Sequence, residues 1–129
     1  MKGYNFKVVP QIVLVRYYKV RFLCRLALAK CKGFMKVLQP LCNFFKAVQS
    51  DGRISVTHIG IYAALLDYRA RKNMQNPVHA FSHEIMALAK IASNFTYYKC
   101  IRELSEYGYI TYIPSYKKTK ASRIYFLEG

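Results

Sequence analysis

The chain has 129 residues, of which 53% are hydrophobic, so it can form one packed domain and is not wholly disordered. Its 21 Lys and Arg outnumber six Asp and Glu, which gives a formal charge of +15. Long-range electrostatics therefore favours an anionic partner, either nucleic acid or anionic lipid headgroups.

The acidic residues are unevenly distributed along the chain. All six lie at or after residue 51, whereas average composition would place roughly six in the first 50 residues. Residues 1–50 carry ten Lys and Arg (+10), and residues 51–129 carry eleven against six acids (+5). We therefore expect a basic N-terminal extension, residues 1–50, and a second domain, residues 51–129, joined by a turn at residues 50–53.

The extension is apolar, but its pattern does not predict a membrane-spanning segment. Basic residues recur too often within residues 8–38 for a spanning helix, and no signal-peptide pattern is present. On a helix they form two separate groups, which makes a membrane-surface helix the weaker alternative. We expect Gln39-Pro40 to lie near the end of the extension. The ten cations of the extension are expected to add non-specific affinity for nucleic acid.

Neither a metal site nor an enzyme is indicated. The four cysteines form no Cys-x-x-Cys pair and have no matching His spacing, so they are interpreted as reduced thiols of a cytoplasmic protein. The sequence has no Gly-rich phosphate loop and no close pair of carboxylates, so we expect no catalysis, no cofactor and no small-molecule substrate. Cys100 falls on an apolar helix face and is interpreted as a buried structural thiol.

Two helices and a short extended segment are predicted at the start of the second domain. The first helix spans residues 56–72 after Ser55 as N-cap. An extended segment at residues 78–81 precedes a second helix, which has Ser82 as its N-cap and Glu84 in its first turn. The expected buried residues are Ile59, Ala63, Leu66 and Ala70 in the first helix, and Ile85, Met86, Leu88 and Ala89 in the second.

A third helix and a hairpin complete the predicted order. A tight turn at residues 90–92 leads to Ser93 as N-cap of a helix over residues 94–107, which ends at Gly108. Two strands follow, at residues 109–113 and 123–127, separated by a basic loop. The residues expected on the buried face of the third helix are Tyr97, Cys100, Ile101 and Leu104.

This order of helix, helix, tight turn, helix and basic hairpin resembles a winged helix-turn-helix domain. The resemblance is sharpest in EIMALAKIASNFTYY (residues 84–98) and IRELSEYGYI (residues 101–110), which are similar to small helix-turn-helix proteins of Bacteroidetes-type mobile elements. It covers about residues 55–129. It implies an α+β fold with a three-helix core and a C-terminal hairpin wing. Its implied function is sequence-specific binding of double-stranded DNA, in transcription regulation or in a replication or mobilisation system.

The chain departs from that pattern at two places. Ala92 stands in the turn where many such proteins have Gly, and the hairpin loop also lacks Gly. The missing Gly in the hairpin predicts a longer wing rather than a tight two-residue turn.

Two basic surfaces are candidate DNA contacts. Arg102 is the candidate for base reading and Lys99 for a phosphate, while the alternative is an ordinary solvated helix face. A winged-helix module that binds protein is the rival function, and a homodimer is left open. The full set of expected DNA-binding residues is Asn94, Phe95, Tyr98, Lys99 and Arg102 on the third helix, and Lys117, Lys118, Lys120 and Arg123 in the hairpin.

Overall fold

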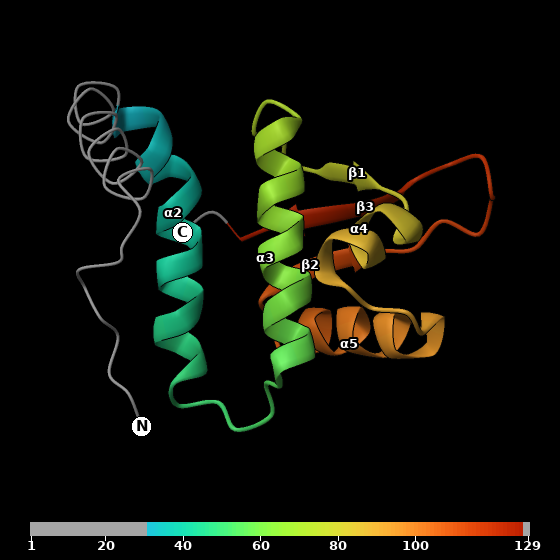
Figure 1. The fold of residues 1–129 in the computed structure, drawn as a ribbon, viewed down its shortest axis with the longest axis horizontal. Coiled ribbons are helices and arrows are strands. Elements are labelled where there is room, and N and C mark those ends of the chain that lie inside the picture. The colour runs from blue at the N-terminus through green and yellow to red at the C-terminus, as the bar shows by residue number, and fades with distance from the viewer. Residues whose placement is uncertain (1–30, 128–129) are drawn as a thin grey trace, which may run out of the picture. The chain divides into compact units, whose positions relative to one another are not determined.

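The computed structural model describes residues 31–127, with side chains described from residue 38 onward. This part of the chain is α+β, with four helices and a small three-stranded antiparallel sheet (Figure 1). The helices are α2 (Cys31–Val48), α3 (Val56–Arg71), α4 (Ser82–Ala89) and α5 (Asn94–Glu106), and the strands are β1 (Val78–Ala80), β2 (Ile110–Ile113) and β3 (Ser122–Phe126).

Most of the predicted extension lies outside the described residues. Residues 1–30, which include most of the apolar but basic stretch at residues 8–38, are not described. Among the helices of residues 31–127, none is both long and apolar enough to cross a membrane.

Helix α2 was not anticipated by the sequence pattern. Pro40, expected near the end of an extension, lies inside α2, which continues to Val48. The Phe44 side chain is only 3% exposed, and its ring stacks on that of Tyr62 with 3.9 Å between centroids. It also meets the Tyr109 ring edge-on at 5.1 Å.

These contacts change the expected domain boundary. The compact unit that holds the core begins at Val37 rather than at residue 51. Leu41 and Val48 of α2 also pack against the core cluster that contains Phe44. The expectation that residues 51–129 close their core unaided therefore leaves out the C-terminal part of α2.

Helix α3 begins where the sequence predicts but buries a different face. Ser55 is the N-cap, and its backbone N–H donates to Nδ1 of His58 at 3.0 Å. Of the four residues expected to be buried, only Leu66 is; the other three are partly exposed. The helix packs against α4 and α5 and also meets Phe44 of α2, so it is covered on more than one side and a single apolar stripe does not describe it. The residues that it buries are His58, Ile61, Tyr62, Ala64, Leu65, Leu66, Tyr68 and Arg69.

Helix α4 is followed by a turn in which a lysine, not a glycine, adopts the left-handed conformation. The N-cap is Phe81 rather than Ser82, and the Glu84 carboxylate accepts its backbone N–H at 3.2 Å. Ile85 and Met86 are buried as expected, whereas Leu88 is 36% exposed. Lys90 adopts the left-handed conformation with φ 59°, so this residue, and not position 92, makes the bend.

Helix α5 agrees with its sequence prediction. The Oγ of Ser93 caps it by accepting the backbone N–H of Thr96 at 3.3 Å. Gly108, with φ 82°, follows its C-terminus. The four residues predicted on the buried face, Tyr97, Cys100, Ile101 and Leu104, are all buried.

Gly108→Ala is expected to destabilise the fold by about 1–2 kcal/mol, because a left-handed φ is costly for a residue with a Cβ. A Cβ at Gly108 would meet no atom within 4 Å, so the cost comes from the backbone alone. Urea unfolding of the parent and of the variant measures this loss in the free energy of unfolding. Gly52→Ala is the control, because its Cβ would also be free and its φ is not in the left-handed range. Equal losses in the two variants would contradict the prediction.

The sheet has the order β1–β3–β2, and both pairs are antiparallel. The extended segment predicted after α3 is β1, and the two predicted hairpin strands are β2 and β3, each shifted by about one residue. The loop over residues 114–121 is long, as expected without Gly, and contains a turn in which the Lys120 N–H donates to the Lys117 carbonyl at 3.0 Å. The sheet therefore presents this basic loop at one end of the hairpin.

Candidate nucleic-acid interface

The exposed face of α5 carries the five side chains selected from the sequence. Asn94, Lys99 and Arg102 are exposed, as are Phe95 at 77% and Tyr98 at 37%. Burial of the opposite face fixes the rotation of the helix about its axis. All five side chains are thus available to a partner from solvent.

The Arg102 side chain is held in place on this face. Its Nε donates to the backbone carbonyl of Tyr98 at 2.9 Å. The Tyr98 hydroxyl donates in turn to Oγ of Ser82 at 3.1 Å, which ties α5 to α4. A guanidinium anchored through Nε still has its terminal N–H groups for a bidentate contact.

Acidic residues border the same face. Nζ of Lys99 lies 4.0 Å from Oε1 of Glu103, at the limit for an ion pair. The second carboxylate oxygen of Glu103 lies 2.9 Å from Nε2 of His58, a side chain that is 5% exposed. Glu103 therefore links α5 to α3 rather than facing outward alone.

The hairpin supplies the second basic surface. Lys117, Lys118 and Lys120 are exposed in the loop, and Arg123 is exposed in β3. A hollow of about 300 Å³ is lined by three of these four cations, namely Lys117, Lys120 and Arg123. We call it the basic hollow.

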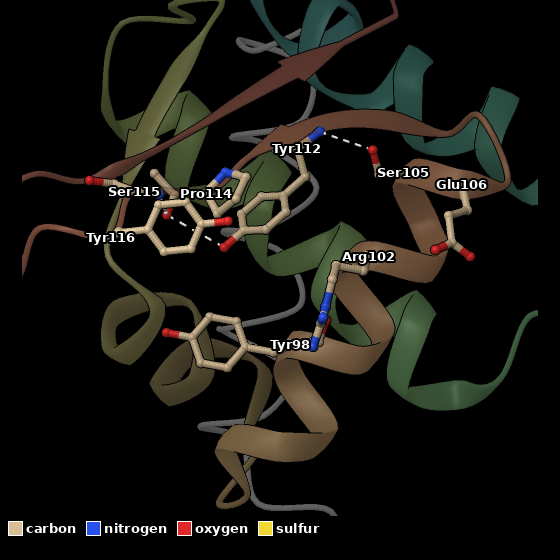
Figure 2. A pocket seen from close by; sticks show the side chains of 9 residues that line it. Tyr98, Arg102, Ser105, Glu106, Tyr112, Pro114, Ser115 and Tyr116 are labelled. Carbon is tan, nitrogen blue, oxygen red and sulfur yellow. Dashed lines mark hydrogen bonds between the residues drawn. The ribbon is translucent and has the colours of Figure 1, made fainter.

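A larger hollow, of about 690 Å³, lies between α5 and the hairpin (Figure 2). Tyr98 and Arg102 line it from α5, Tyr112 from β2 and Tyr116 from the loop. We call it the tyrosine hollow. Of the residues predicted from the sequence, Tyr98 and Arg102 line this hollow, whereas none of the four hairpin cations does.

The walls of the tyrosine hollow are bonded to one another. The Tyr112 backbone N–H donates to Oγ of Ser105 at 3.1 Å, which joins β2 to α5. The Ser115 backbone N–H donates to Oγ of Ser122 at 3.2 Å, which joins the loop to β3. Burial raises the pKa of the Tyr112 phenol above its ordinary value, which already lies well above neutral pH, so this hydroxyl is uncharged.

Tyr112 and Tyr116 were not among the residues expected from the sequence. Twelve tyrosines in 129 residues were the available signal, but composition alone does not say which rings gather on one surface. Tyr116 is 94% exposed, which is unusual for a large aromatic side chain.

A cluster of His58, Cys100 and Glu103 was also not anticipated, because the sequence had indicated no metal site. Their ligand atoms lie within 4.8 Å of one another. Nδ1 of His58 accepts the Ser55 N–H, and Nε2 faces Glu103, so both ring nitrogens already have partners. Burial and the charge of Glu103 raise the pKa of the Cys100 thiol, which disfavours the thiolate that metals bind. We interpret the His58–Glu103 pair as a hydrogen-bonded link between α3 and α5, with Cys100 buried beside it.

Comparison of the chain with known proteins adds no family. It matches no protein-family model, no curated protein and no solved structure. Function is therefore inferred from the side chains of α5 and the hairpin.

Proposed function

We propose that the chain binds double-stranded DNA sequence-specifically as a winged helix-turn-helix protein. In this proposal α4 and α5 form the helix-turn-helix, α5 is the recognition helix, and the β2–β3 hairpin is the wing. The observation that carries it is that the exposed face of α5 and the hairpin loop flank one hollow, so a single duplex can touch both. The exposed cations of α5 and of the hairpin attract the phosphates of such a duplex.

In this arrangement α5 reads the major groove. Arg102, pre-oriented by its bond to the Tyr98 carbonyl, is assigned to O6 and N7 of a guanine. Lys99 is assigned to a phosphate, and Asn94 to an adenine or a phosphate near the helix N-terminus. Phe95 and Tyr98 offer apolar contact to thymine methyl groups or sugar edges.

The wing supplies affinity more than sequence discrimination. Lys117, Lys118, Lys120 and Arg123 are assigned to phosphates, which are the same in every duplex. The biological role that fits this activity is a transcription regulator or the DNA-recognition part of a replication or mobilisation system. We propose no catalytic activity for the chain.

Arg102→Ala tests the base-reading role. Loss of a bidentate contact to guanine is expected to weaken binding to the preferred duplex by about 1–3 kcal/mol and to relax preference at one base pair. Binding to a scrambled duplex should change little. The measurement is a titration of a duplex selected from a random pool and of its scrambled version.

Arg71→Ala is the matched control, because this arginine is also exposed but lies on α3 and pairs with Asp67 at 2.8 Å. It should leave the ratio of the two affinities unchanged. If Arg102→Ala behaves like Arg71→Ala on both duplexes, α5 does not read bases. A winged-helix module that binds protein then becomes the better interpretation.

A further inference from the structure

We infer that the tyrosine hollow receives an unpaired nucleobase, with the adjoining phosphate in the basic hollow. The inference rests on the proposed function, because it assigns single-stranded DNA at a duplex end or junction to the same surface. It adds a second kind of nucleic-acid contact that duplex binding alone does not require.

Aromatic rings surround the space that a base would occupy. Figure 2 shows the rings of Tyr112 and Tyr116 on one side of the tyrosine hollow and that of Tyr98 on the other, with Arg102 beside the gap. Nucleobases stack on such rings whatever their sequence, because every base has a π face. A paired base inside a duplex is already stacked, so only an unpaired base can use these faces.

The size and polar groups of the hollow also suit a base. Its volume of about 690 Å³ is within the range of small-molecule sites. The Ser105 hydroxyl, whose oxygen accepts the Tyr112 N–H, supplies a donor for ring nitrogens and carbonyl oxygens, and the Glu106 carboxylate supplies an acceptor for amino groups. Glu106 would repel a phosphate, so this hollow suits the base rather than the backbone.

The basic hollow accounts for the phosphate. It shares Pro114, Ser115 and Tyr116 with the tyrosine hollow, so these three residues form the ridge between the two. Lys117, Lys120 and Arg123 line the far side of that ridge, and none of the described residues lining this hollow is acidic. A nucleotide whose base stacks on Tyr116 can therefore place its phosphate among these cations.

The test compares a blunt duplex with the same duplex carrying a single-stranded thymidine tail, both fluorescently labelled and titrated with the full chain. The parent is expected to bind the tailed duplex about ten- to a hundredfold more tightly, the range that stacking of one base supports. Tyr116→Ala should remove most of this preference. Tyr116→Phe should keep it, because the ring remains. At 94% exposure, neither change disturbs the core.

Each outcome decides between the two proposals. Equal binding of tailed and blunt duplexes by the parent, or a tail preference that survives Tyr116→Ala, overturns the inference while duplex binding stands. A tail preference without blunt-duplex binding supports the inference and contradicts the proposed function. Absence of binding to either DNA contradicts both.

Discussion

Replacing Lys117, Lys118 and Lys120 together with alanine should flatten the plot of log affinity against log salt by about 2.7 units. Each phosphate contact releases condensed counterions and contributes about 0.9 unit to the slope, and three contacts are lost. All three lysines are exposed in the hairpin loop, so their removal leaves the core untouched. Because phosphates carry no sequence information, selected and scrambled duplexes should lose affinity alike. Titrations of both duplexes at several salt concentrations measure the slope.

A variant with the same charge change elsewhere separates position from net charge. Lys46, Arg71 and Lys72 lie on or at the end of α2 and α3, and none of them lines either hollow. Replacing these three with alanine should change the slope far less. Equal slopes in the two triple variants would mean that net charge, and not the wing, sets the affinity.

Phe44→Ala is expected to lower the free energy of unfolding by about 3–5 kcal/mol. The Phe44 ring is 3% exposed and contacts the rings of Tyr62 and Tyr109, so its removal leaves a cavity in the core. A fragment that starts at residue 51 lacks the same ring. Urea unfolding of the full chain and of the variant gives the difference directly.

Phe45→Ala is the matched control, since this neighbouring ring on α2 is 44% exposed. Its truncation should cost less than about 1 kcal/mol, as for most surface changes. If Phe44→Ala costs no more than Phe45→Ala, α2 is not part of the folded unit, and the boundary at residue 51 is restored.

The elements that could be predicted are those that follow local rules. Helix α5 packs on one side only, so its apolar spacing matches its buried face, and Ser93 and Gly108 mark its ends. Helix α3 is covered on several sides, so spacing alone selected the wrong face. Helix α2 was missed because Pro40 and the surrounding basic residues are typical of a chain segment outside a domain.

The residues of the candidate site also divide into those that local spacing predicts and those that long-range contacts place. Residues such as Lys99 and Arg102 could be placed on an exposed face because the opposite face of α5 is apolar. Tyr112 and Tyr116 could not be placed, because they reach the hollow only through the pairing of β2 with β3 and the path of the loop. Helical periodicity contains no information about that long-range arrangement.

The most direct test of the central claim is photocrosslinking from α5 to the bases of a bound duplex. A photoreactive phenylalanine analogue replaces Phe95, which is 77% exposed on α5, or Phe45 on α2 as control. With excess scrambled duplex as competitor, the proposed function predicts that position 95 crosslinks to bases of the selected duplex and position 45 does not. Crosslinking at position 45 with none at position 95, or none at either position when the duplex is bound, would contradict the assignment of α5 as the DNA-reading helix.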